Sequence, residues 1–147
     1  MNAMVATSPT GVQQCRVRLA TGPAAPGEAR SQVRAAIRDW GVPVDPDAAM
    51  LLTSELVTNA IACETDETVT LGIRCLRGGL RVDVYDTSPS FPVVTVAPGD
   101  AETGRGLMLV AALAAEWGFY RTPGGKAVYF TLLFRDVGMG PPAPGGS

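Results

Sequence analysis

Hydrophobic and polar residues alternate along several short stretches of the chain. Alternation with a period of two predicts β-strands that bury one face. Glycine pairs or a Pro-Gly-Gly sequence separate the stretches that follow each other closely, so these stretches are expected to form hairpins. The expected strands cover residues 12–19, 68–77, 80–86, 119–121 and 127–134.

Three other stretches repeat their apolar residues every three or four positions, which predicts helices with one apolar face. Gly41 is a natural stop for the first helix. Asp45 and Pro46 suit the cap and the first position of the second, and Gly118 is expected to end the third. The expected helices cover residues 28–40, about 46–62 and 106–117.

The order of these elements is strand, two helices, two strands, a Pro-rich loop, a helix and two strands. Adjacent strands with inserted helices favour an antiparallel or mixed sheet with helices on one face, which is a two-layer α+β sandwich. We expect a single domain over residues 12–136. Residues 1–11 are expected to be a flexible terminus, and residues 137–147 a disordered Gly/Pro-rich tail.

The composition describes a globular protein without a basic footprint: 147 residues, 46% hydrophobic and 18% charged, with a net charge of −2. Nucleic acid is therefore not expected as the main partner. No stretch approaches the ~20 apolar residues of a membrane-spanning helix, and residues 1–10 lack the order of a signal peptide, so we expect a cytoplasmic protein.

The chain has three cysteines and no histidine. The cysteines show no metal-ligand spacing, and we expect Cys15 and Cys75 in the core. The absence of histidine excludes a serine triad, an imidazole metal site and a phosphohistidine relay carried by this chain.

Asp86 stands where the apolar face of the stretch 80–86 should continue. An ionised carboxylate in such a place is costly unless it is hydrogen-bonded. Two interpretations stay open. Either the strand ends at Tyr85 and Asp86 opens an Asx turn toward Ser88, or Asp86 accepts a hydrogen bond from a ligand amine at the mouth of a pocket.

Glu55 and Asn59 lie four residues apart on the second expected helix, so they share one face a turn apart. Asn59 borders the apolar arc of this helix, where a pocket-lining helix would place polar groups. A carboxylate and a carboxamide are hard oxygen ligands suited to Mg²⁺. The alternative is an ordinary solvated helix face.

Two glycine-containing sequences are candidates for phosphate contacts. Residues 104–107, Gly-Arg-Gly-Leu, open the third expected helix. Free N–H groups and the helix dipole favour an anion there, and Arg105 adds a positive charge. Many helices start after glycine without binding anything. Residues 124–126, Gly-Gly-Lys, are interpreted first as a hairpin turn and second as a phosphate contact.

The order of these features resembles the GHKL superfamily of gyrases, chaperones, histidine kinases and mismatch-repair ATPases. Residues 52–61 look like its N box, and residues 82–88 and 102–110 are similar to its two glycine-box segments. Residues 125–130 resemble the closing strand of the short bacterial branch. The compact length, and Arg105 between two glycines, point to the anti-sigma-factor serine kinases.

The resemblance implies a Bergerat-type ATP-binding fold with ATP and Mg²⁺ as cofactors. Asn59 would hold Mg²⁺ against the triphosphate. Glu55 would act as general base toward a serine hydroxyl of a partner, and Asp86 would accept from the adenine amino group. The further candidate binding residues are Ser88, Gly104, Arg105, Gly106, Leu107 and Lys126.

The function implied is an ATP-binding regulator, an anti-sigma-factor serine/threonine kinase that sequesters a sigma factor and phosphorylates an antagonist protein. A homodimer is left open. One alternative is a non-catalytic regulator, motivated by Ser88 and Pro89 at the expected pocket edge and by the lack of a basic residue just after the N box. Another is the detached ATP-binding half of a histidine kinase, against which the absence of histidine argues.

Overall fold

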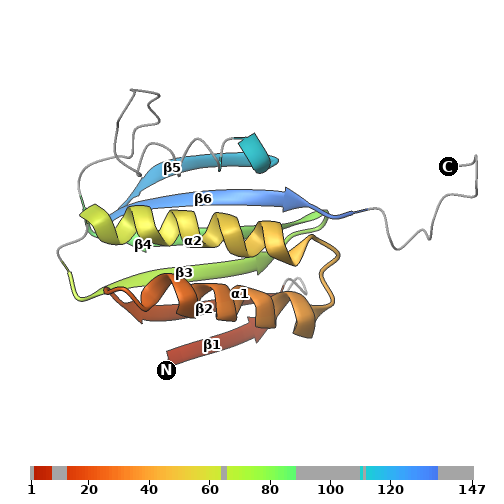
Figure 1. Ribbon diagram of the computed structural model, residues 1–147, viewed down its shortest axis with the longest axis horizontal. Coiled ribbons are helices and arrows are strands. Elements are labelled where there is room, and N and C mark those ends of the chain that lie inside the picture. The colour runs from red at the N-terminus through yellow and green to blue at the C-terminus, as the bar shows by residue number, and fades with distance from the viewer. Residues whose placement is uncertain (1, 8–12, 64–65, 89–109, 111, 136–147) are drawn as a thin grey trace, which may run out of the picture.

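The computed structural model describes residues 2–7, 13–63, 66–88, 110 and 112–135. The six strands and two long helices of this part follow the chain in the order strand, strand, helix, helix and four strands (Figure 1). Their bounds are β1 Asn2–Thr7, β2 Gln13–Ala20, α1 Ala25–Trp40, α2 Pro46–Cys63, β3 Thr68–Cys75, β4 Gly79–Asp86, β5 Glu116–Thr122 and β6 Gly125–Leu133.

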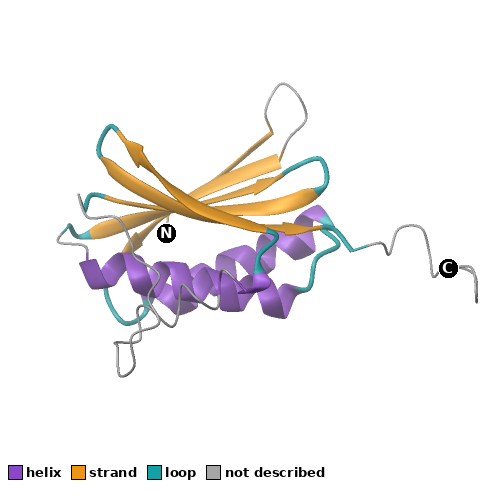
Figure 2. Cartoon of the chain, turned by 90° about the horizontal axis from the view of Figure 1, so that it is seen from above, coloured by secondary structure: helices purple, strands orange, loops and turns teal. Residues whose placement is uncertain are grey.

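The strands form one sheet in the order β1-β2-β3-β4-β6-β5. Every pairing among the described residues is antiparallel. The turn between β3 and β4 is closed by a hydrogen bond of 2.8 Å from the Leu76 N–H to the Gly79 carbonyl, as the glycine pair predicted. Both helices lie on the same face of the twisted sheet (Figure 2). The expected α+β sandwich is confirmed.

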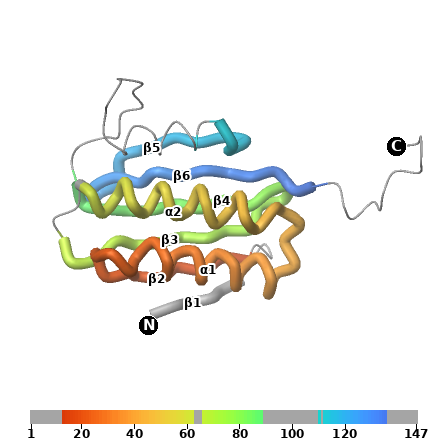
Figure 3. The backbone as a smooth tube through the Cα atoms, viewed as in Figure 1, coloured from red at the N-terminus to blue at the C-terminus, as the bar shows by residue number. Residues whose placement is uncertain are grey.

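The hydrophobic core fills the space between the sheet and the helices. α1 packs on β2 and β3, and α2 packs mainly on β4 and β6 (Figure 3). Alternate residues of each inner strand face this core, for example Val17 and Leu19 on β2. Leu52 and Leu56 of α2 are fully buried against them. Burying such a side chain contributes about 1.5–3 kcal/mol, which makes the apolar faces the main stabilising feature.

The helix ends follow the local signals. Gly41 adopts a left-handed conformation with a φ of 65°, and its N–H reaches back to the Arg38 carbonyl at 3.3 Å. The Asp45 carboxylate accepts a hydrogen bond of 3.0 Å from the Asp47 N–H, so it caps α2 as expected. α1 begins three residues earlier than expected, because Pro26 fits its first turn.

Two local expectations are wrong. Residues 2–7, assigned to a flexible terminus, form the edge strand β1, because the free edge of β2 supplies hydrogen-bond partners that no local pattern reveals. The expected helix 106–117 ends too late, since β5 already begins at Glu116, and Trp117 pairs with Phe130 of β6. Residues 106–109, and the tail 137–147, lie outside the described residues.

Candidate functional site

Asn59 is one of two buried polar residues of α2, with Thr53, whose side-chain oxygen lacks a hydrogen-bond partner in the described chain. Its side chain is buried, and its Oδ1 atom makes no hydrogen bond within the part of the chain that the structure describes. An unsatisfied buried amide oxygen costs about 1–3 kcal/mol, so its retention indicates a partner other than the residues that the structure describes. Glu55, one helical turn earlier, is half-buried.

Asp86, the last residue of β4, has a fully buried carboxylate. Its Oδ1 accepts hydrogen bonds from the Lys126 ammonium at 2.7 Å and from the Ser88 N–H at 2.9 Å. Its Oδ2 accepts a second bond from the same ammonium at 2.9 Å. The Ser88 bond is the Asx turn of the first interpretation, yet Asp86 also keeps its place in the strand and on the core-facing side. Both features of the sequence are therefore present together.

Lys126 is the partner that the sequence did not reveal for Asp86. It lies opposite Asp86 in the β4–β6 ladder, and its residue exposure is 1%. The sequence predicts a hairpin turn or a phosphate contact at this position, whereas the Lys126 ammonium bonds to the Asp86 carboxylate. Only the register of two strands forty residues apart brings the two groups together. Strand alternation places the Asp86 carboxylate on the apolar face and so predicts that it needs a hydrogen-bond partner. It does not show which residue supplies that partner.

The candidate residues gather at one end of the sandwich. β4 ends and β6 begins at the same edge of the sheet, and the C-terminal end of α2, which carries Asn59, lies over that edge (Figure 1). The structure therefore brings the α2 residues and the Asp86–Lys126 pair to a common region. Gly104, Arg105, Gly106 and Leu107 lie outside the described residues, and their roles stay predictions.

The donor set at this end fits Mg²⁺ better than a softer metal. The free oxygen of Asn59 is a hard ligand, and Mg²⁺ takes few protein groups because it keeps several waters and the oxygens of a bound phosphate. Among the described residues, no group of three or more cysteines or carboxylates is arranged to hold a metal ion. A single carboxamide ligand thus suits a metal that arrives with a nucleotide.

The opposite face of the sheet carries a second polar cluster. Asp83 is buried there beneath Arg81, which donates to it at 2.9 and 3.0 Å, and Tyr120, whose hydroxyl donates to it at 2.8 Å. Arg81 also lies 3.9 Å from the centre of the Tyr129 ring. The pKa of Tyr120 is raised above its ordinary value, first by burial and then by hydrogen bonds to Tyr85 and Asp83. Asp83 lies on the face opposite to that of Asp86 because the two residues are an odd number of positions apart in β4, and only the tertiary structure supplies its partners.

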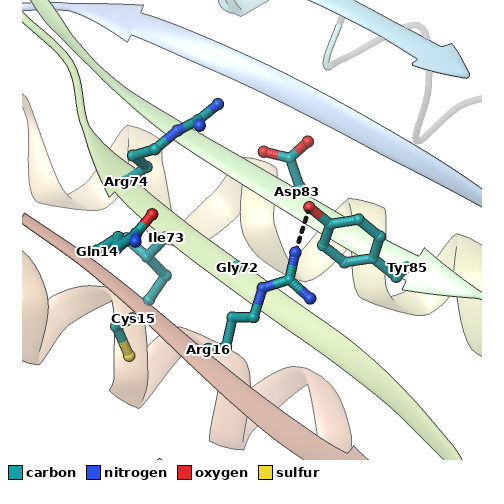
Figure 4. Close-up of a pocket in the computed structure, with 8 residues that line it drawn as sticks. All are labelled: Gln14, Cys15, Arg16, Gly72, Ile73, Arg74, Asp83 and Tyr85. Carbon is teal, nitrogen blue, oxygen red and sulfur yellow. Dashed lines mark hydrogen bonds between the residues drawn. The ribbon is translucent and has the colours of Figure 1, made fainter. Parts of the chain in front are cut away.

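Two hollows border this second face. One, of about 60 Å³, lies among Gly72, Asp83 and Tyr85, and Arg16 donates to the Tyr85 hydroxyl at 3.1 Å beside it (Figure 4). The other, of about 300 Å³, reaches from Arg18 to Asp86. Arg18 and Tyr85 point away from the helices, so the sheet separates most of both hollows from Asn59. We therefore do not assign the candidate site to either.

The helices of the described part include none that is both long and apolar enough to span a membrane.

Comparison with known families gives a match over most of the chain. Residues 19–132 match the family model described as the histidine kinase-like ATPase domain. This range covers α1, α2, β3, β4, β5 and all but the last residue of β6, and it contains Glu55, Asn59, Asp86 and Lys126. No curated protein matches the chain.

Two solved structures are similar to it. One is the structure of the RsbU and RsbW domains of Rv1364c from Mycobacterium tuberculosis, with 20% identity, a TM-score of 0.58 and coverage of 80% of this chain. The other is the histidine kinase domain of the blue-light activated histidine kinase EL346 from Erythrobacter litoralis, with 25% identity, a TM-score of 0.47 and coverage of 79%. The chain spans 32% and 64% of these two structures, and the first likeness concerns the fold alone.

Proposed function

The chain belongs to the histidine kinase-like ATPase domain family, and on this premise we propose that it is an ATP-binding regulator that acts as an anti-sigma-factor serine/threonine kinase. In this proposal it sequesters a sigma factor and phosphorylates an antagonist protein, in the cytoplasm. The observation that carries the nucleotide part is Asn59, whose buried Oδ1 has no hydrogen-bond partner in the described chain and lies one helical turn after Glu55.

The side chains supply the groups that phosphoryl transfer requires. Asn59 would hold Mg²⁺, which neutralises charge on the phosphates when it is bound. The partner's serine oxygen would form a bond to the γ-phosphorus while the bond to the bridging oxygen breaks and ADP leaves. Glu55 would take the hydroxyl proton, for which its half-buried position on the same helix face is suited. Positioning and charge neutralisation account for most of the catalysis in such reactions, so this small set is sufficient.

The nucleotide part is tested by calorimetry with ATP and ADP, with and without Mg²⁺. We expect wild type to bind ATP more tightly with Mg²⁺ than with EDTA, and Asn59→Ala to lose this difference. Thr58→Ala changes an exposed neighbour on the same helix and serves as the matched control. If wild type shows no heat of binding up to millimolar nucleotide, ATP binding is refuted.

The kinase part is tested with radiolabelled ATP, Mg²⁺ and a panel of antagonist-like proteins, with a sister kinase as positive control. We expect serine phosphorylation by wild type and a loss of at least about 100-fold in Glu55→Gln, since general-base catalysis contributes about 10²–10⁴-fold. Glu67→Gln, an exposed glutamate outside the helix, is the control. Phosphorylation of these substrates by the sister kinase alone would contradict the kinase assignment.

A non-catalytic regulator is the second candidate, and the Asp86–Lys126 pair favours it. Both oxygens of Asp86 accept bonds from Lys126, so the two charges neutralise each other without a ligand and the pair can serve as a structural ion pair alone. Such a protein would bind its partner with weak nucleotide dependence or none. Glu55→Gln separates the two candidates, because a regulator that works by binding alone keeps its full effect on sigma-dependent transcription in that variant.

A further inference from the structure

Lys126 is the only lysine in the chain; every other basic side chain is an arginine. Lysine is among the residue types least often buried, and then almost always paired. Here its residue exposure is 1% and that of its side chain 2%. The single lysine side chain is therefore buried beside Asp86, while all other basic side chains of the protein are arginines.

Among the residues that the structure describes, the hydrogen bonds of the pair leave one donor and one acceptor position unused. An ammonium has three N–H donors, and Lys126 donates two bonds, both to Asp86. An ionised carboxylate has about four acceptor positions, and Asp86 uses two on Oδ1 and one on Oδ2 within the described chain. The ammonium with the unused N–H lies 2.9 Å from Oδ2, the oxygen that keeps the unused lone pair among the described residues.

This arrangement complements the edge of a 6-aminopurine, which presents an N–H donor on N6 beside the acceptor N1. We propose that Lys126 is a specificity-determining residue that donates to adenine N1 while Asp86 Oδ2 accepts from the N6 amino group. The inference rests on the proposed nucleotide binding and names the residue that reads the base. A guanine in the same orientation would place its N1–H opposite the Lys126 ammonium. Both groups are hydrogen-bond donors, so no hydrogen bond could form between them.

The test uses the wild-type protein and analogues that differ by one ring nitrogen. Calorimetry compares ATP, 1-deaza-ATP, which lacks the N1 acceptor, and 7-deaza-ATP, which lacks a ring nitrogen on the other edge. Hydrogen bonds to charged groups are worth about 1.5–3 kcal/mol, so we expect 1-deaza-ATP to bind at least about tenfold more weakly than ATP. 7-deaza-ATP should bind within about threefold of ATP, and GTP should bind at least as weakly as 1-deaza-ATP.

Lys126→Met completes the comparison. This variant should lose about tenfold in affinity for ATP and almost nothing for 1-deaza-ATP, because the analogue has no acceptor for the ammonium. Arg77→Met, at the exposed β3–β4 turn, is the control for a lost positive charge. If Lys126→Met does not fold, the single lysine permits a second measurement: the one ¹⁵Nζ signal of ¹⁵N-lysine-labelled wild type should shift with ATP and stay in place with 1-deaza-ATP.

The outcomes separate the two proposals. Equal affinities for ATP and 1-deaza-ATP, or GTP binding as tight as that of ATP, overturn the role of Lys126 and leave ATP binding intact. Absence of binding to every nucleotide overturns the proposed function, and the base-reading role with it.

Discussion

Lys126→Met removes the ammonium from the buried pair and keeps most of the side-chain volume. The Asp86 carboxylate then keeps its 0% side-chain exposure, and among the described residues it is left with the Ser88 N–H as its only bond and without an opposite charge. Removing one partner of a buried ion pair typically costs about 3–5 kcal/mol, because the other charge stays desolvated. We expect a loss of this size, which corresponds to a fall in Tm of roughly 10 °C for a chain of this length.

The double variant Asp86→Leu/Lys126→Met makes the prediction specific. Replacing both partners by apolar residues leaves no stranded charge, so its stability should lie within about 2 kcal/mol of wild type and above that of either single variant. Urea unfolding followed by circular dichroism measures all four proteins at one pH. Arg38→Met, which breaks an ion pair with side chains 71% and 63% exposed, should cost less than about 1 kcal/mol. Additive losses, or a cost for Lys126→Met no larger than that for Arg38→Met, would refute the reasoning.

Three further substitutions test the surroundings of the site and the second face of the sheet. Gly125→Ala should destabilise the protein by more than about 2 kcal/mol, because a Cβ there would overlap the backbone at the end of β4. The control Gly124→Ala has open space around the new Cβ and should be nearly neutral. Urea unfolding measures both variants. Asp83→Ala should lower the free energy of unfolding by about 1–3 kcal/mol, because the Arg81 guanidinium and the Tyr120 hydroxyl lose their acceptor. Glu116→Ala removes one exposed hydrogen bond to the Tyr129 hydroxyl and should lower it by less than about 1 kcal/mol. Equal losses in the two variants would contradict the argument from burial. Because the pKa of Tyr120 is raised in the folded protein, the unfolded chain loses the phenol proton above about pH 10 while the folded protein retains it. The free energy of unfolding should therefore fall as the pH rises above about 10. In Tyr120→Phe this fall should be less steep between about pH 10 and about pH 11.5.

Local signals determined the inner part of the fold. The β3–β4 hairpin follows from alternation and a glycine pair, and the start of α2 follows from Asp45 and Pro46. These features were predictable because strand period, turn and cap each involve residues within a few positions of one another. The edge strand β1 and the true start of β5 were missed, since both depend on pairing with a neighbouring strand that local pattern does not encode.

The candidate site divides in the same way. The alternation of side chains along residues 80–86 places Asp86 on the core face, and helical spacing places Glu55 and Asn59 on one side of α2. The sequence by itself therefore determined which polar groups require a partner. That Asn59 Oδ1 lacks a partner in the described chain, and that Lys126 takes the Asp86 carboxylate, were decided only by the tertiary structure. The physical reason is that a hydrogen bond between residues forty positions apart depends on strand register and on the exclusion of water, and both arise only once the sheet and helices have packed.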